Sequence, residues 1–354
     1  MSRFFSYKYK DLDPYVPGEQ PKDQKYIKLN TNESPFPPSP RASELASAAA
    51  GRLQLYSDPE CRELTTLVAK RCGVEYENVL MTNGSDEILN FAFMAFCDEE
   101  HPAIFPNITY GFYSVFAQLN GIPYREIPLK EDFTVDLNDY VHAKGTVFLA
   151  NPNAPTGIAL PLSEIERLVA SDPDRVVVID EAYVDFGGES AVPLIKKYDN
   201  LLVTQTFSKS RSMAGARLGF GIGCASLIAD LNTIKYSTNP YNVNAMTQAA
   251  GIGAILCEDY FSQNCQTVIE NRSYLTRELD ALGFTFTESK ANFVFAKHEK
   301  ICGQALYDAL RVRGILVRHF TKPLIAEYNR ITVGTREEMQ ALVDAIRNIM
   351  EELS

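Results

Sequence analysis

Lys209 is the side chain of this sequence whose setting most clearly suggests chemistry. It follows residues 200–203, an apolar run typical of a buried strand, and a lysine amine can act as a nucleophile or carry a proton. Thr206, Ser208 and Arg217 lie close by and offer hydroxyl and guanidinium groups of the kind that bind phosphate. Parallel α/β sheets place ligands at the carboxyl ends of their strands. A single lysine there is most often a solvated surface residue, so the prediction of an amine nucleophile beside a phosphate site depends on further residues.

Polar side chains also follow two other apolar runs. Asp180 comes directly after residues 176–179, and its carboxylate could hold a proton on a pyridine-type nitrogen or simply cap the next turn. Tyr183 could donate its phenol proton to an oxygen on the same ring. Asn151 opens a turn rich in proline and glycine at 151–157, where its amide could meet that oxygen or the segment could be an ordinary loop. Together these residues favour a flat, ring-containing ligand.

Two strand-to-helix connections offer further contacts. Gly84, Ser85 and Asp86 open a predicted helix, whose free amides and dipole attract anions, although Ser and Asp cap helices far more often than they bind ligands. Tyr110 could stack on a planar ligand or pack in the core, and the sequence leaves both open.

Arg318 and Arg330 lie in apolar segments near the carboxyl-terminal end. A charged side chain in such a segment is costly without a partner, and a carboxylate or phosphate would suit each guanidinium. A salt bridge at the edge of a sheet is the alternative. The four histidines show no metal-ligand spacing and the seven cysteines form no Cys-x-x-Cys pair, so we expect neither a metal site nor a disulfide framework.

The elements that must position these residues alternate between strand and helix patterns from residue 79 onward. Continuous apolar strands favour a mostly parallel sheet buried on both faces, hence an α/β class with three layers, α/β/α. After residue 241 helices dominate, and the final segments suggest a smaller α+β domain. We expect a large domain over 30–250 and a small domain over 1–29 and 251–354. The expected strands and helices are 79–81, 85–96, 103–105, 111–120, 124–128, 146–150, 162–170, 175–180, 200–203, 245–257, 259–282, 291–296, 303–313, 315–320, 330–333 and 336–353.

Composition narrows the class of protein. The chain has 354 residues, 45% of them apolar, which suffices for a large core. Its net charge of −11 argues against nucleic acid or an anionic membrane as the main partner. The amino-terminal residues lack the apolar core of a signal peptide, and no run of about 18 apolar residues is present. We therefore expect a cytoplasmic protein.

Taken in order, these segments resemble the fold-type I pyridoxal-phosphate-dependent aminotransferases. The resemblance covers nearly the whole chain and rests on Asn-Gly-Ser-Asp-Glu at 83–87, Tyr110, Asn-Pro-Asn-Ala-Pro-Thr-Gly at 151–157, Asp-Glu-Ala-Tyr at 180–183, Ser208-Lys209, Arg217 and Arg330. Within that group the chain is most similar to the histidinol-phosphate aminotransferases, through Asp-Pro-Tyr at 13–15, Leu-Asn-Thr-Asn-Glu-Ser at 29–34, Leu-Tyr-Ser-Asp-Pro at 55–59, Val317-Arg318 and Arg-Ile-Thr-Val-Gly-Thr at 330–335.

The resemblance implies an aspartate aminotransferase-like fold, pyridoxal 5'-phosphate as cofactor and a homodimer. Lys209 would carry the cofactor covalently and act as catalytic acid and base, while Asp180 would pair with the ring nitrogen and Tyr183 would bind the ring oxygen. The implied cofactor-binding residues are Gly84, Ser85, Asp86, Tyr110, Asn151, Asp180, Tyr183, Thr206, Ser208, Lys209, Arg217 and, from a partner subunit, Tyr56. The implied substrate-binding residues are Tyr15, Asn151, Arg318 and Arg330. Which arginine binds phosphate and which binds carboxylate stays open.

The implied reaction converts L-histidinol phosphate and 2-oxoglutarate to imidazole acetol phosphate and L-glutamate, a step of histidine biosynthesis. An aromatic amino acid aminotransferase would use the same catalytic residues. A threonine-phosphate decarboxylase, which is a lyase, would release carbon dioxide without consuming an oxo acid. A cofactor-sensing regulator would carry a DNA-binding segment ahead of the domain, which the short amino terminus does not offer.

Overall fold

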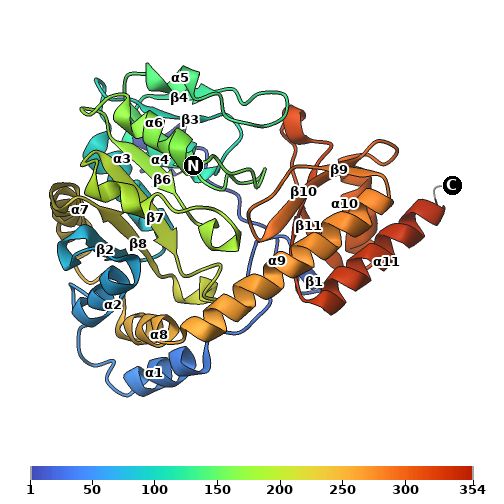
Figure 1. Ribbon diagram of the computed structural model, residues 1–354, viewed down its shortest axis with the longest axis horizontal. Coiled ribbons are helices and arrows are strands. Elements are labelled where there is room, and N and C mark those ends of the chain that lie inside the picture. Colours follow the sequence, from blue (N-terminus) through green and yellow to red (C-terminus); the bar gives the residue numbers. More distant parts are fainter. Residues whose placement is uncertain (1, 353–354) are drawn as a thin grey trace.

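A large β-sheet forms the centre of the computed structural model, which describes residues 2–352 (Figure 1). It has seven strands in the order β2-β8-β7-β6-β5-β3-β4. Their bounds are β2 Val79–Thr82, β3 Ala103–Pro106, β4 Tyr124–Ile127, β5 Thr146–Ala150, β6 Val177–Asp180, β7 Leu201–Thr206 and β8 Gly219–Gly223. Pairing is parallel from β7 through β6, β5 and β3 to β4, whereas β8 runs antiparallel to both β2 and β7. The prediction of a mostly parallel sheet is confirmed.

Helices cover both faces of this sheet and extend beyond it. Their bounds are α1 Pro40–Ala50, α2 Arg62–Cys72, α3 Ser85–Phe96, α4 Phe112–Asn120, α5 Asn138–Val141, α6 Leu162–Ala170, α7 Ala225–Thr238, α8 Ala245–Ile255, α9 Glu258–Ala281, α10 Gly303–Val312 and α11 Arg336–Glu352. Short 3-10 helices lie at Tyr7–Tyr9, Tyr76–Asn78, Val184–Phe186, Val192–Lys196, Ala214–Ala216 and Pro323–Ile325.

The three layers follow from the alternation of side chains along each strand. In β6, Val177 and Ile179 pack in a buried cluster with residues of α2, α6 and α8. Val178 points the other way, into a cluster with residues of α3, α4 and α7. Since both faces are apolar, each polar side chain needed for chemistry can emerge only at the ends of the strands.

A second sheet collects the remaining strands in the order β1-β11-β12-β10-β9. Their bounds are β1 Ile27–Leu29, β9 Phe284–Phe286, β10 Phe293–His298, β11 Ile315–His319 and β12 Asn329–Thr332. The amino-terminal strand β1 pairs parallel with β11, with Ile27 opposite Ile315. Helices α9, α10 and α11 pack on this sheet through a shared apolar cluster, and α9 links the two parts of the molecule (Figure 1). This is the smaller α+β unit that the sequence predicts.

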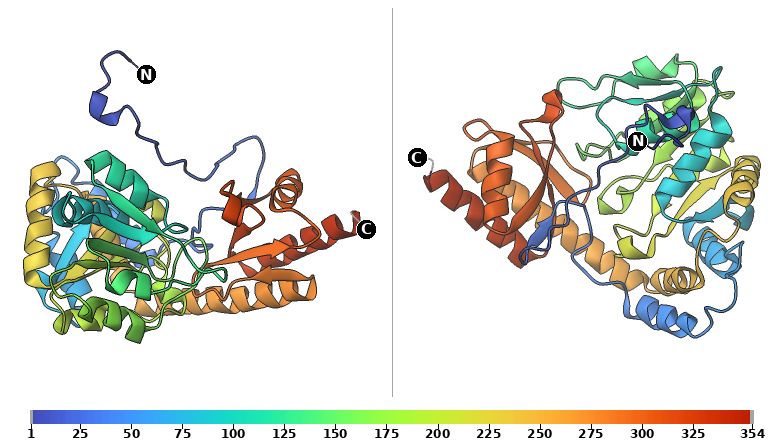
Figure 2. Two further views of the ribbon diagram at one scale, coloured as in Figure 1. Left: turned by 90° about the horizontal axis from the view of Figure 1, so that it is seen from above. Right: turned by 180° about the vertical axis from the view of Figure 1, so that it is seen from behind.

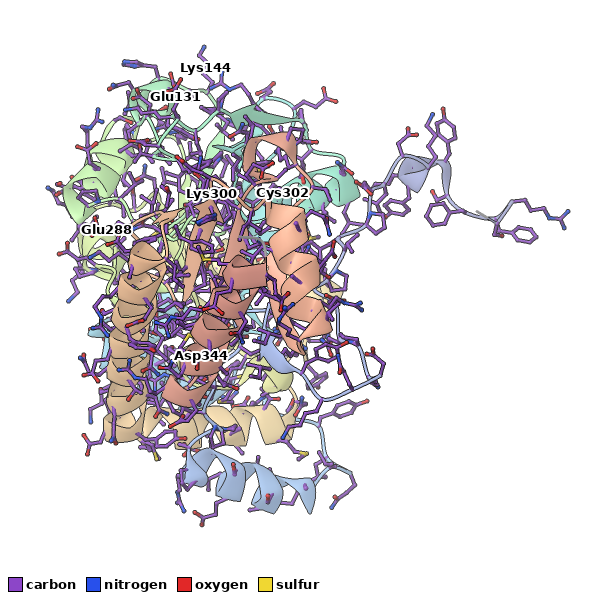
Figure 3. The ribbon with its side chains drawn as sticks, turned by 90° about the vertical axis from the view of Figure 1, so that its right-hand side faces the viewer. Glu131, Lys144, Glu288, Lys300, Cys302 and Asp344 are labelled. Atoms are coloured by element: carbon purple, nitrogen blue, oxygen red, sulfur yellow. The ribbon has the colours of Figure 1, made fainter. Side chains whose placement is uncertain are left out.

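The first dozen described residues extend away from the body of the molecule, and the chain then crosses toward the second sheet (Figures 2 and 3). Figure 3 also shows Lys300 and Cys302 at the start of α10, on the side of the second sheet. Among residues 2–352, no helix has both the length and the apolar character needed to cross a membrane.

The structure contains several elements that the sequence does not predict, at the amino-terminal end and farther along the chain. The sequence predicts an irregular path for the proline-rich residues 35–40, but Pro40 begins α1, with the side chain of Ser39 accepting a hydrogen bond from the amide of Ala42. Proline is compatible with the first position of a helix, because the N–H group that it lacks would have no partner within the helix there. The sequence patterns also do not predict helices α2, α5 and α7 or strands β1 and β9. The last helix ends at Glu352, and Leu353, at the end of the expected range 336–353, lies outside the described residues.

Candidate active site

The carboxyl ends of β6 and β7 and the amino-terminal end of α3 border a cavity of about 210 Å³, here called the inner cavity. Most of the residues predicted to hold a ring-containing phosphate ligand line it. These are Ser85, Asp86, Tyr110, Asp180, Tyr183, Thr206, Ser208, Lys209 and Arg217. Parallel pairing brings the ends of β6 and β7 side by side, with Asp180 opposite Thr204, which explains why residues far apart in the sequence meet here.

Arg217 organises one end of the inner cavity. Its guanidinium donates to a carboxylate oxygen of Asp86 at 2.9 Å and to the hydroxyl of Ser208 at 3.4 Å. Glycine suits position 84, because the backbone there has a φ of +76°, which other residues rarely adopt, and a Cβ would lie 2.6 Å from Nη2 of Arg217 and displace it. Helix α3 begins at Ser85, so the positive end of its dipole lies at the same place. A guanidinium beside a helix start makes this end suitable for a phosphate.

Asp180 is a buried carboxylate, 4% exposed, at another part of the same cavity. It accepts hydrogen bonds from the hydroxyl of Tyr113 at 3.1 Å, the hydroxyl of Thr204 at 3.3 Å and the amide of Ala182 at 3.2 Å. All three donors are neutral, and burial raises the pKa of Asp180 to about 6. A positively charged N–H in the cavity would therefore stabilise this carboxylate strongly.

The amine of Lys209 lies where the inner cavity meets a larger one of about 680 Å³, here called the outer cavity. Nζ of Lys209 donates to the carbonyl oxygen of Thr31 at 3.3 Å and lies 5.8 Å from the centre of the Tyr183 ring. The Tyr183 hydroxyl accepts a hydrogen bond from the side-chain amide of Asn32 at 3.0 Å. The nucleophile predicted from the sequence can thus reach a group bound in either cavity.

Tyr15, Arg318 and Arg330 line the outer cavity. Arg318 and Arg330 are direct partners across the β11–β12 pair, an arrangement of like charges that is unfavourable unless an anion joins them. Arg330 is half-buried, and its buried Nε has no hydrogen-bond partner among residues 2–352, while Nη2 donates to the carbonyl of Asn30 at 3.0 Å. Burial lowers the pKa of Arg330. Two adjacent guanidiniums with unused donors indicate a binding place for a carboxylate or phosphate.

Three predicted site residues lie outside the walls of both cavities. Gly84 stands behind Arg217, as described above. Asn151 is buried, and its side chain bonds to the backbone of Leu160, accepting from the amide at 2.7 Å and donating to the carbonyl at 3.3 Å. Tyr56 is 83% exposed and stacks on Tyr241 with ring centres 4.5 Å apart. Their roles stay predictions.

The structure adds residues that the sequence did not single out for the site. Thr31 and Glu33 line the inner cavity, and Tyr113 contacts Asp180 from α4. Burial acts to raise the pKa of Glu33, but hydrogen bonds from Lys28 and Thr31 and the charge of Lys209 lower it overall. Thr31 and Glu33 could have been found from the run 29–34, which contributes to the family resemblance. No sequence signal marks Tyr113, because it lies inside an apolar helix pattern.

The family description Aminotransferase class I and II matches residues 24–346 of this chain. Histidinol-phosphate aminotransferase 1 of Bradyrhizobium diazoefficiens is 49% identical over 350 residues, which cover 99% of this chain and 100% of the relative. Histidinol-phosphate aminotransferase 2 of Dechloromonas aromatica is 50% identical over 355 residues and covers 99% of each chain.

Solved structures agree on the fold. The crystal structure of histidinol-phosphate aminotransferase from Sinorhizobium meliloti in complex with pyridoxal-5'-phosphate has a TM-score of 0.86 and 24% identity, and the match covers 94% of this chain and 93% of that one. The predicted aspartate aminotransferase-like fold is confirmed by such neighbours, among them an aspartate aminotransferase from Thermotoga maritima with a TM-score of 0.83. From the extent of the family match and the identity of the full-length relatives, we conclude that this chain belongs to the aminotransferase class I and II family.

Proposed function

We propose that this chain is a pyridoxal-phosphate-dependent aminotransferase that acts on L-histidinol phosphate and 2-oxoglutarate, and so works in histidine biosynthesis. The observation that carries the substrate is the full-length identity of 49–50% to relatives named histidinol-phosphate aminotransferase. The chemistry is supported by the lysine amine at the junction of one cavity suited to phosphate and another lined by paired arginines.

The inner cavity fits the cofactor in charge and in hydrogen bonding. Arg217 and the start of α3 at Ser85 would hold its phosphate, together with Asp86, Thr206 and Ser208. Asp180 would hold a proton on the ring nitrogen, because a buried carboxylate with neutral donors gains from a cationic N–H partner. When bound, pyridoxal 5'-phosphate takes up the substrate amine and withdraws electron density from the α-carbon. Tyr110 borders the cavity and would stack on the ring, while Tyr183 and Asn151 would contact its oxygen.

Lys209 has two tasks in this proposal. Its amine would hold the cofactor covalently in the resting enzyme. Once free, Nζ would act as the base that accepts the proton of the substrate α-carbon and as the acid that later gives it up. Its position at the junction of the two cavities suits both tasks.

The outer cavity would hold the remainder of the substrate. Histidinol phosphate brings a phosphate and no carboxylate, whereas glutamate and 2-oxoglutarate bring two carboxylates. Arg318 and Arg330 would therefore bind different anions in the two halves of the reaction, with Tyr15 beside them. Planar guanidiniums accept either anion through two parallel N–H bonds.

The proposal includes a homodimer in the cytoplasm, in which the exposed Tyr56 reaches the cofactor phosphate of the partner subunit. Exposed tyrosines such as Tyr56 and Tyr241 are typical of protein interfaces. We also propose that residues 30–250 form the large domain and that 1–29 and 251–354 form the small one, in keeping with the pairing of β1 with β11.

A half-reaction tests the substrate. Purified holoenzyme is mixed with histidinol phosphate, histidine, phenylalanine or glutamate alone, and the visible absorbance of the cofactor is followed. We expect rapid bleaching with histidinol phosphate and with glutamate. Bleaching with phenylalanine but not with histidinol phosphate would identify an aromatic aminotransferase. Release of carbon dioxide from threonine phosphate without an oxo acid would identify the lyase.

A further inference from the structure

We propose that Glu19 is a positioning residue for substrate binding, acting through the segment 13–19, here called the strap. This inference rests on the proposed substrate roles of Tyr15, Arg318 and Arg330. The strap has no regular secondary structure and passes from the side of the large sheet toward the second sheet (Figure 2). Three of its residues, Tyr15, Val16 and Gly18, line the outer cavity.

The carboxylate of Glu19 fastens one end of the strap to α10. The Tyr307 hydroxyl donates to one of its oxygens, and Nε of Arg311 lies 3.3 Å from the other. Burial and this hydrogen bond raise the pKa of Tyr307 to about 12, so the phenol remains a donor at neutral pH. Tyr307 also lies beside the ring of His319, the residue after Arg318, with ring centres 5.9 Å apart. Glu19 is thus joined to the helix that packs behind the proposed anion site.

The other end of the strap is held by α4, beside the large sheet. The amide of Asp13 donates to the side-chain oxygen of Gln118 at 3.3 Å. The ring of Tyr15 stacks on Phe112 with centres 4.3 Å apart. The strap therefore spans the outer cavity between one anchor on α4 and one on α10.

Between these anchors, the strap contacts Arg318 directly and is linked to Arg330 through Asn30. The carbonyl of Val16 accepts from Nη2 of Arg318 at 3.5 Å. The backbone carbonyl of Glu19 accepts from the side-chain amide of Asn30 at 2.9 Å, and the backbone carbonyl of Asn30 accepts from Arg330. Glu19 is therefore linked to Arg330 through one residue, Asn30, and to Arg318 through the strap residues between Glu19 and Val16.

The physical role of Glu19 follows from the entropy of an irregular segment. Without its anchor on α10, the strap would have to be ordered each time a substrate binds, and that cost would weaken binding. The inner cavity shares no wall residue with the strap. Loss of Glu19 should consequently affect binding of substrates while leaving the cofactor and the chemical step nearly unchanged.

Steady-state kinetics of Glu19→Gln holoenzyme test this inference. We expect KM for the amino donor and for the oxo acid to rise about tenfold, because Gln loses the charge that strengthens the bonds to Tyr307 and Arg311, with kcat within about twofold of the wild type. Apo-protein titrated with pyridoxal phosphate should show unchanged affinity. Asp23→Asn is the matched control, since it removes one negative charge four residues away, at a carboxylate that is bonded, within residues 2–352, only to the nearby exposed Tyr26 hydroxyl.

A second variant shows whether Glu19 acts through α10. Tyr307→Phe should raise KM in the same way, and the double variant should show less than the sum of the two effects, because Tyr307→Phe removes the donor of the hydrogen bond whose charged acceptor Glu19→Gln makes neutral. The inference is overturned if Glu19→Gln lowers only thermal stability, if it lowers kcat at unchanged KM, or if the two variants are fully additive. Failure of the wild type to use histidinol phosphate would instead contradict the proposed function, since the KM comparison can be made with any donor that the wild type accepts.

Discussion

The two cavities that meet at Lys209 are built in different ways. The inner cavity is formed largely by the ends of neighbouring strands of one sheet and the start of α3, all backed by buried apolar clusters. The outer cavity combines an irregular amino-terminal segment, loops of the large sheet and strands β11 and β12 of the second sheet. The proposed chemistry thus lies at the edge of one packed sheet, whereas the proposed substrate recognition lies where parts of the chain that are distant in sequence meet.

This difference suggests how a protein can retain its reaction while its substrate changes. Groups at the ends of buried strands cannot shift without disturbing the core, because protein interiors are closely packed. A strap and two strand arginines can be altered with much less effect on the fold. Substitutions in the inner cavity should therefore abolish turnover, whereas those in the outer cavity should change KM.

The largest effect is expected for Lys209→Ala. Loss of the covalent attachment point and of the catalytic acid and base should lower kcat by roughly 1000-fold or more. Lys197→Ala is a suitable control, because Lys197 pairs with Glu166 at the surface, outside both cavities. Circular dichroism should show that both variants fold. Substantial turnover by Lys209→Ala would contradict the proposal that Lys209 is the catalytic residue of the inner cavity.

A smaller effect, confined to KM, is expected on the other side of Lys209. Arg330→Lys keeps the charge but loses the planar pair of donors, and we expect KM for 2-oxoglutarate to rise about 100-fold because the site is desolvated. Arg318→Lys should raise it only about fivefold, since Arg318 is partly exposed and bonds to the strap at 3.5 Å. Equal effects of the two variants on every substrate would show that the arginines do not differ in role.

The smallest effect concerns the stability of the cofactor-free protein. Burial raises the pKa of Asp180 from 3.8 to about 6, so the folded protein keeps a proton that the unfolded chain loses, and stability falls as pH rises through this range. Asp180→Asn should therefore increase the free energy of unfolding by about 1 to 2 kcal/mol at pH 7.5, a figure that allows for the weaker hydrogen bonds to the new side-chain amide. At pH 4 the same substitution should change the free energy of unfolding little. Urea unfolding at the two pH values measures this.

Asp139→Asn provides the comparison, because Asp139 is exposed and lies outside both cavities. If wild type and Asp180→Asn are equally stable at both pH values, then the buried charge of Asp180 does not lower the free energy of unfolding. If Asp180→Asn is more stable but inactive, then the carboxylate at the end of β6 serves function at the expense of stability. This is expected if Asp180 pairs with a protonated ring nitrogen.

Most of the large sheet could be predicted because its elements carry strong local patterns. The strand at 146–150 and the helices at 85–96 and 162–170 have the same bounds in the structure as in the prediction. The three-residue strand β1 could not be predicted, since so short a segment forms only by pairing with β11, almost three hundred residues later. Helix α1 was hidden by the prolines before it, which predict an extended path when read alone.

The chemical inventory of the protein was decided by the sequence alone. Lys209, Asp180 and Ser85 each follow or open a regular element with a clear pattern, and such local signals do not depend on the rest of the chain. Only the tertiary structure decided that Tyr113 supports Asp180, that Arg318 and Arg330 stand side by side, and that Glu19 fastens the strap to α10. These contacts join residues far apart in the chain, and their geometry depends on packing between elements, which no local pattern of side chains contains.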